Sequence, residues 1–249
     1  MNKVLACIDN SETARDVLAT AQKLAPTLDA NVEAVHVAED GDRSARASAE
    51  TAHIPFRRLR GDPFEQLAAA INQPDVVGAV LGARSHSAGA HAGHLAPQLA
   101  VSTNRPIVVV PPGAQLPRQI RRVLVAMKGT ARSTMSLKRA LRIAPGADLE
   151  LVILHVDDES TIPQFSDQIQ HETEAYASEF LTRYAVGAPS ARLELRVGVP
   201  ADEILVAADA EHPDLIALGW PSQADAGHGT VARTVLERSH VPMLLVATS

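Results

Sequence analysis

Two stretches of the sequence combine glycine and small polar residues with the start of a helical pattern, and this combination can bind an anion. The first stretch runs from Gly82 to His94, and the second runs from Gly219 to Thr230. Unpaired N–H groups and the helix dipole at a helix start favour a phosphate group. The same residues are also typical of an ordinary loop and cap, so this pattern alone leaves both interpretations open.

A carboxylate and a lysine occupy matching positions ahead of these two stretches. Asp9 ends an apolar run that contains Cys7, and Lys128 ends a similar run further along the chain. Lys128 can pair with a phosphate as a point charge or form an ion pair with a nearby carboxylate. Cys7 is the single cysteine, so the chain cannot form an internal disulfide, and we expect a buried, small apolar side chain.

The sequence gives little support for a metal-binding or catalytic site. The histidines of the first stretch are spaced unlike any familiar metal motif, and we assign no metal site. Motifs of hydrolases, P-loop proteins and zinc proteases are absent from the sequence. Ser11 is expected to cap a helix that follows Asp9, and we assign no catalytic residue. Trp220 either stacks on a base or packs in the core.

The elements that position these residues occur twice in the chain. The run Lys3–Asp9 resembles Arg122–Lys128, and Ala34–Val37 resembles Ile153–Val156, both at an offset of 119 residues. Later matches are offset by 136 or 137 residues, which indicates an insertion in the second copy. Five matches in the same order predict two similar domains.

Each copy alternates short β-branched runs with helical patterns, which predicts a parallel sheet with intervening helices. The expected strands cover residues 3–9, 31–38, 54–60, 76–82 and 106–111, and then 122–128, 149–156, 192–198, 214–219 and 241–247. In the second copy, helices are expected over residues 133–144, 160–186, 201–211 and 230–239. The first copy has only residues 40–53 in place of the long helix, so we expect one face of its sheet to be less covered.

Domain boundaries follow from a proline-rich connector. Residues 113–119 form the predicted linker, between a first domain over residues 1–112 and a second over residues 120–249. Ligands of such sheets bind at the carboxyl ends of strands where the strand order reverses. If the first and fourth strands are neighbours, Asp9 faces Gly82 across a crevice, and Lys128 faces Gly219.

Composition narrows the class of partner. The chain is 46% hydrophobic but only 3% aromatic, which suits strands of Ala, Val, Leu and Ile buried on both faces. Its net charge of −6 argues against nucleic acid or an anionic membrane as a main partner. A signal peptide and a long apolar run are not evident, and we expect a cytoplasmic protein.

These motifs resemble the universal stress protein family, twice and over nearly the whole chain. The markers are Ile8-Asp9, Leu154-His155-Val156, Asp214–Gly219, Gly229-Thr230 and Val241–Val246. The resemblance implies an α/β fold of two tandem, doubly wound, five-stranded parallel-sheet domains of the adenine nucleotide alpha hydrolase-like, Rossmann-like sandwich type. It also implies a framework role for His36 and His155.

One branch of this family binds ATP through an Asp that ends the first strand and a loop of the form Gly-x2-Gly-x9-Gly-Ser/Thr. Carried over to the first domain, the resemblance implies the candidate nucleotide-binding residues Cys7, Asp9, Val37, Leu81, Gly82, Arg84, Ser85, Gly93, His94 and Leu95. In the second domain the candidates are Lys128, Val156, Leu218, Gly219, Ser222, Gly229, Thr230 and Val231.

Both copies depart from that pattern. Ser85 and Ser222 stand where the middle glycine belongs, His94 replaces Ser or Thr in the first copy, and Lys128 replaces Asp in the second. The spacers of seven and six residues are shorter than nine, so each loop has less room to surround three phosphates.

Three functions therefore remain open at this stage. The first is a non-catalytic stress-response or regulatory module with degenerate nucleotide-binding loops. The second is an ATP- or AMP-binding stress signalling protein that uses the crevice of the first or second domain, with Mg²⁺ only if ATP binds. The third is an enzyme such as a slow ATPase.

The resemblance also implies how the domains associate. Single-domain relatives pair through their last strands, so Ile107–Val110 and Met243–Val246 are expected to meet within one chain as a pseudo-dimer. Further pairing into a homodimer is left open, and neither nucleic acid nor membrane is expected as a partner.

Overall fold

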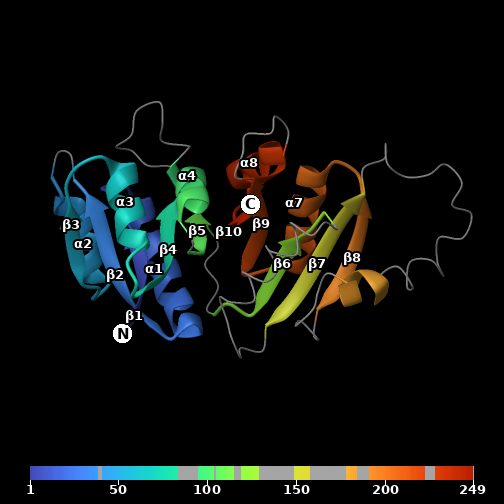
Figure 1. Ribbon diagram of the computed structural model, residues 1–249, viewed down its shortest axis with the longest axis horizontal. Coiled ribbons are helices and arrows are strands. Elements are labelled where there is room, and N and C mark those ends of the chain that lie inside the picture. The colour runs from blue at the N-terminus through green and yellow to red at the C-terminus, as the bar shows by residue number, and fades with distance from the viewer. Residues whose placement is uncertain are drawn as a thin grey trace, which may run out of the picture.

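Ten strands of the two domains form a single sheet. The computed structural model describes residues 1–38, 41–83, 95–103, 105–114, 119–128, 149–157, 178–183, 191–221 and 228–248. The strand order is β3-β2-β1-β4-β5-β10-β9-β6-β7-β8, so each domain supplies one half of the sheet (Figure 1). The α/β fold with two parallel half-sheets confirms the predicted fold class.

Domain 1 contains the first five strands of the chain. They are β1 (Asn2–Cys7), β2 (Ala30–Val37), β3 (Phe56–Leu59), β4 (Val76–Gly82) and β5 (Ile107–Val110). The helices are α1 (Thr13–Leu24), the 3-10 turn η1 (Ala25–Leu28), α2 (Arg43–Thr51), α3 (Pro63–Ile71) and α4 (Leu95–Ser102). β1 lies between β2 and β4 and is parallel to both, which confirms the reversal of strand order expected beside the first strand.

Domain 2 repeats this order. Its strands are β6 (Arg122–Ala126), β7 (Glu150–Asp157), β8 (Arg192–Val197), β9 (Leu215–Pro221) and β10 (Met243–Thr248). Its described helices are α7 (Pro200–Glu211) and α8 (His228–Arg238), together with a helical turn over residues 178–183. The helix predicted over residues 133–144 and most of the one predicted over 160–186 lie outside the described residues.

Matching glycines reveal the repeat at the level of backbone conformation. Gly61 has a φ of 122° and Gly198 a φ of 149°, and each lies between a strand and the following helix. Residues with a Cβ rarely adopt such values. The two domains therefore share the same turn from β3 to α3 and from β8 to α7.

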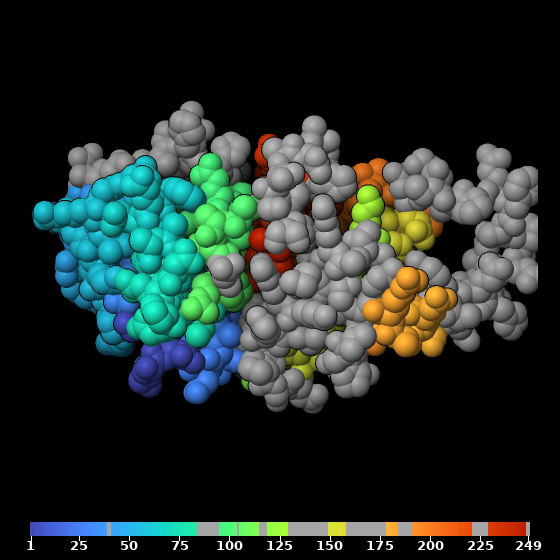
Figure 2. All heavy atoms as spheres, in the orientation of Figure 1, coloured from blue at the N-terminus to red at the C-terminus, as the bar shows by residue number. Residues whose placement is uncertain are grey.

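The two half-sheets join through their last strands. β5 and β10 are antiparallel, with Met243 opposite Val109 and Leu244 opposite Val108. Val108 and Leu244 are almost completely buried. This pairing confirms the predicted intrachain association of the last strands. In Figure 2 the atoms of domain 1 and those of the C-terminal strand region meet along this seam.

Both faces of the sheet are covered, as the composition predicts. One face packs against α3, α4, α7 and α8, and the other packs against α1, α2 and the turn at residues 178–183 (Figure 1). Apart from Trp220 and Phe180, the buried core is almost entirely aliphatic, so its strands are apolar on both faces. Because both faces are packed, the strand ends that border the candidate site are held in fixed positions.

One local expectation was wrong. Ser11 does not cap α1, which has Glu12 at its N-cap and no side-chain cap hydrogen bond. The short helix α2 lies where the first copy has residues 40–53, and it buries Ala45 and Ala49 completely. Whether this face is less covered than its counterpart in domain 2 stays a prediction, because most of the long helix predicted there lies outside the described residues.

The exact domain boundaries stay a prediction, and residues 115–118 of the predicted linker lie outside the described part of the chain. No helix among the described residues has the length and apolar character needed to cross a membrane.

Candidate functional site

The first and fourth strands of domain 1 end side by side. Cys7 lies opposite Leu81 in the β1–β4 pairing, so the residues just beyond both strands meet at one edge of the sheet. Asp9 and Gly82 line the same hollow there. The crevice predicted between these two residues is therefore present.

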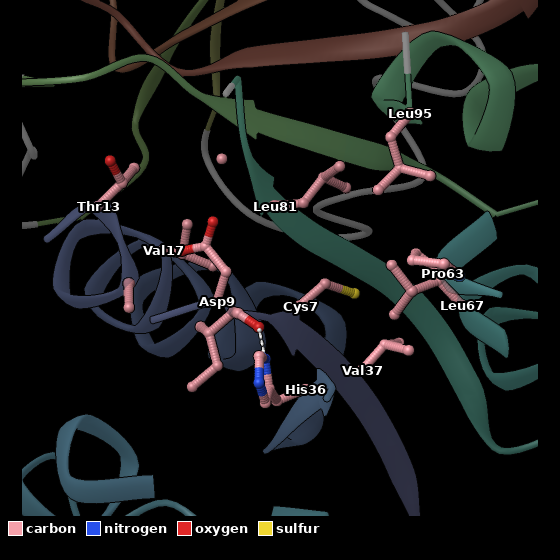
Figure 3. A pocket seen from close by; sticks show the side chains of 13 residues that line it. Cys7, Asp9, Thr13, Val17, His36, Val37, Pro63, Leu67, Leu81 and Leu95 are labelled. Carbon is pink, nitrogen blue, oxygen red and sulfur yellow. Dashed lines mark hydrogen bonds between the residues drawn. The ribbon is translucent and has the colours of Figure 1, made fainter. Parts of the chain in front are cut away.

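The hollow has a volume of about 50 Å³ and mostly apolar walls (Figure 3). Its polar side chains are Asp9, Thr13 and His36, from the tip of β1, from α1 and from β2. The full lining comprises Cys7, Ile8, Asp9, Thr13, Ala14, Val17, His36, Val37, Pro63, Leu67, Leu81, Gly82 and Leu95. The described lining contains no lysine or arginine. Asp9 is the one carboxylate in it, so this lining carries one formal negative charge.

Sequence reasoning located part of this lining and missed the rest. The predicted residues Cys7, Asp9, Val37, Leu81, Gly82 and Leu95 lie together around the hollow. Arg84, Ser85, Gly93 and His94 lie outside the described residues, as do His86 and His91. Residues from α1 and α3 were missed. The apolar residues near the start of each helix could have indicated them. Each of these helices follows a parallel strand, so it begins at the edge of the sheet where the strands end.

Ser11 holds the carboxylate of Asp9 in place. The Ser11 backbone N–H donates to Asp9 Oδ1 at 3.0 Å, and the Ser11 hydroxyl donates to the same oxygen. A carboxylate accepts several such bonds, because its two oxygens together offer about four lone-pair directions. Two donors on one oxygen fix the rotamer of Asp9 at the mouth of the hollow.

Cys7 forms part of the apolar floor. Its side chain is buried, and burial raises the pKa of the thiol to about 12, against a small opposing effect of the Arg57 charge. The thiolate is the nucleophilic form of cysteine, so a protonated thiol is a packing group here and not a nucleophile. This confirms the expectation of a buried, small apolar side chain.

His36 fastens the tip of β1 to the segment that precedes α2. Its Nδ1 lies 2.9 Å from the carbonyl oxygen of Ile8, and its Nε2 lies 3.2 Å from the carbonyl oxygen of Gly41. Asn10 adds a second link, since its Nδ2 donates to the same Gly41 oxygen at 3.3 Å and its Oδ1 accepts from the N–H of Ala45 at 3.0 Å. Both neighbours of Asp9 in the sequence are thereby anchored.

His155 repeats the first of these contacts in domain 2. Its Nδ1 lies 2.9 Å from the carbonyl oxygen of Met127, whereas its Nε2 lies 3.2 Å from the Asp157 carboxylate. Its ring also packs against Phe180 at a centroid distance of 5.2 Å. Both histidines are almost fully buried, and these contacts confirm the predicted framework role.

The tip of β6 carries a different group at the matching position of domain 2. Lys128 is exposed where domain 1 has Asp9, and its expected ion pair is not among those that join described residues. Val156 lies at the end of β7, whereas Leu218 and Gly219 lie in the middle of β9, which continues to Pro221. The remaining candidates on α8 are Gly229, Thr230 and Val231, and Ser222 lies outside the described residues.

Trp220 is a further difference between the two domains. It follows Gly219 in β9 and is 9% exposed. Its apolar cluster includes Ala232, Val235 and Leu236 of α8. Of the two roles considered for Trp220, the structure shows the packing role. Domain 1 has the small Ala83 at the position after Gly82.

No group of three or more histidine, cysteine or acidic side chains among the described residues is placed to hold a metal ion.

The comparison with family models decides the family. Residues 119–247 match the model described as the universal stress protein family. The chain belongs to the universal stress protein family. The match covers domain 2, and the strand order of domain 1 repeats that of domain 2.

Solved structures match this universal stress protein over its full length. A universal stress protein from Archaeoglobus fulgidus DSM 4304 is 17% identical, with a TM-score of 0.67, and the match covers 100% of this chain and 97% of that one. A protein of unknown function from Pseudomonas aeruginosa PAO1 is 12% identical, with a TM-score of 0.69 and coverage of 100% and 93%. These likenesses show the two-domain fold.

A universal stress protein solved in complex with cAMP is 25% identical, with a TM-score of 0.40. The match covers 52% of this chain and 98% of that one. A search of curated proteins found no match.

Proposed function

We propose that this universal stress protein is a non-catalytic regulatory module of the stress response in which the crevice of domain 1 binds one small adenine ligand, adenosine or AMP. Domain 2 serves as its structural partner. The observation that carries this proposal is the difference between the two strand tips. A carboxylate borders an apolar hollow in domain 1, and an exposed lysine stands at the same position in domain 2.

The chemistry of the hollow suits the nucleoside end of the ligand. An adenine ring buries apolar surface against side chains such as Leu81 and Leu95, and ribose hydroxyls can donate to the Asp9 carboxylate. Because Ser11 fixes that carboxylate, little side-chain entropy is lost when the ligand binds. Thr13 supplies a hydroxyl at the same mouth.

The phosphate end of the site favours a short ligand over ATP. Ser85 stands where the loop of the nucleotide-binding branch has its middle glycine, the point at which the backbone can approach the phosphates closely. The spacer before Gly93 is also two residues shorter than in that branch. ATP with Mg²⁺ is therefore the weaker alternative, and we expect no ATP turnover.

Isothermal titration calorimetry with adenosine, AMP and ATP tests this proposal on the full chain. We expect adenosine and AMP to bind at least as tightly as ATP, and Asp9→Asn to weaken binding by roughly tenfold or more, as for loss of a hydrogen bond to a charged group. Lys128→Ala is the matched control and should leave affinity unchanged. ATP binding far tighter than AMP, or equal loss in both variants, would contradict the proposal.

A further inference from the structure

The most informative unexplained feature of domain 1 is the set of partners of His36. Both ring nitrogens face backbone carbonyl oxygens, those of Ile8 and Gly41, and His36 is 4% exposed. A carbonyl oxygen only accepts hydrogen bonds, whereas a neutral imidazole has one donor and one acceptor nitrogen. Neutral His36 therefore satisfies one of these carbonyls and turns a lone pair toward the other.

We propose that His36 is a proton-controlled clasp that regulates ligand binding in the domain 1 crevice. As an imidazolium it donates to Ile8 and to Gly41, and it joins the tip of β1 to the segment before α2. On loss of a proton, the shorter contact to Ile8 keeps the remaining N–H, and the link to Gly41 is lost. This inference rests on the proposed function for its ligand, since the clasp surrounds the same crevice.

The position of Asp9 connects the clasp to the ligand. Ile8, which precedes Asp9, is anchored by His36 Nδ1, and Asn10, which follows Asp9, shares the Gly41 oxygen with His36 Nε2. Asn10 also accepts from Ala45 near the start of α2. The neutral ring already anchors Ile8, and protonation of His36 adds the link to Gly41, the residue that Asn10 also contacts, so it stabilises the arrangement that binds.

Charged groups of both signs surround His36. Asp9 lies beyond β1, Arg58 lies opposite His36 on β3, and Asp42 and Arg46 lie at the start of α2. The hydrogen bond from Arg46 lowers the pKa of Asp42, and the charges of Arg58 and His36 act in the same direction. α1 contributes only uncharged side chains to the hollow, namely Thr13, Ala14 and Val17. Among the described residues, the two groups within hydrogen-bond distance of the ring nitrogens are both carbonyl acceptors, so the hydrogen-bond geometry distinguishes the two protonation states of the ring.

Domain 2 provides an internal control. His155 makes the same Nδ1 contact, but its Nε2 faces the carboxylate of Asp157 and not a backbone carbonyl. That contact joins two residues of the same strand, because both belong to β7. The described Nε2 contact of His155 therefore does not link β7 to a neighbouring segment, as that of His36 links β2 to the segment before α2.

The first test measures adenosine affinity by calorimetry at pH 5.5 and pH 8.0, a range that spans histidine titration. Adenosine is used because the phosphate of AMP itself titrates near pH 6. We expect the wild-type chain to bind about fivefold more tightly at pH 5.5, as for one modest hydrogen bond. His36→Asn, which keeps a donor at the Nδ1 position only, should remove this dependence, and His155→Asn should preserve it. A wild-type affinity that does not change with pH would overturn the inference.

A second test works without ligand. In nuclear magnetic resonance spectra of the wild-type chain, the amides of Asn10 and Ala45 should shift together with the titration of the His36 ring. If the ring titrates and these amides stay still, the clasp does not exist, whatever adenosine does. If these amides shift but adenosine binds at neither pH, the clasp stands, and the proposed function and the coupling to a ligand are overturned.

Discussion

The tips of β1 and β6 are held by the same histidine contact but carry side chains of opposite charge. In both domains Nδ1 of a buried histidine lies 2.9 Å from the carbonyl oxygen of the residue 28 positions earlier, Ile8 at the tip of β1 or Met127 at the tip of β6. Directly after that carbonyl, domain 1 has the carboxylate of Asp9 and domain 2 has the exposed ammonium group of Lys128. The same fold therefore holds two different groups at the same point.

This difference shows that the histidine contact that supports the strand tip and the charged residue that follows it can vary independently. His36 and His155 share one framework contact, because each lies within hydrogen-bond distance of the carbonyl oxygen at a strand tip, and a buried carbonyl needs a partner. Asp9 lies just beyond β1, and Ser11 donates to it from within the same turn. We expect a substitution at this position to change ligand binding more than it changes the sheet.

The largest expected effect on stability comes from the β5–β10 seam, which joins the two compared domains into one sheet. Leu244→Ala removes a fully buried side chain at the β5–β10 junction and should lower the free energy of unfolding by about 2–5 kcal/mol. Val206→Ala, at a side chain that is 51% exposed, is the control and should change it by no more than about 0.5 kcal/mol. Urea denaturation measures both, and equal small changes would show that the seam contributes little.

The floor of the hollow gives the next effect. Burial raises the pKa of the Cys7 thiol to about 12 in the folded chain, whereas in the unfolded chain the thiol loses its proton near its ordinary pKa of 9.0. Stability from this group is therefore complete below pH 9 and is lost as pH rises from there toward 12, by about 2 kcal/mol at pH 10.5.

The variant Cys7→Ala introduces the residue that domain 2 has at this position, Ala126. Relative to wild type, it should become more stable as the pH is raised from 8 to 10.5. Parallel pH profiles for the two proteins in urea denaturation would mean that the Cys7 thiol is not buried as described.

The smallest effect comes from the shared turn. Gly61→Ala and Gly198→Ala each place a Cβ on a backbone with positive φ, and each should cost about 1–2 kcal/mol. Gly198→Ala should cost more, because its Cβ would lie 3.0 Å from Glu203 Oε1, against 3.3 Å from Gln66 Nε2 at Gly61. Thermal unfolding of the two variants checks this order, and a harmless substitution at either site would contradict the equivalence of the turns.

Much of this architecture was predictable from the sequence, because it follows from repetition and burial. The runs that became β1, β4, β6 and β9 are apolar, and parallel strands buried on both faces need such runs. The β5–β10 seam was predictable only through the resemblance to single-domain relatives, since nothing in Ile107–Val110 itself specifies its partner strand.

The local chemistry of the site was harder to predict. Ser11 has the residue type of a helix cap, yet its hydroxyl donates to Asp9, because a short polar side chain has several backbone and carboxylate partners within reach. The contact between His36 and Gly41 joins residues whose spacing carries no motif. Such contacts depend on the path of a loop, which sequence periodicity does not describe.

The number of adenosine molecules bound per chain tests the central claim most directly. Native mass spectrometry of the full chain with excess adenosine should show one bound molecule for wild type, one for Lys128→Ala and none for Asp9→Asn. Two bound molecules in wild type, or retention of the ligand by Asp9→Asn, would contradict the account that only the domain 1 crevice binds.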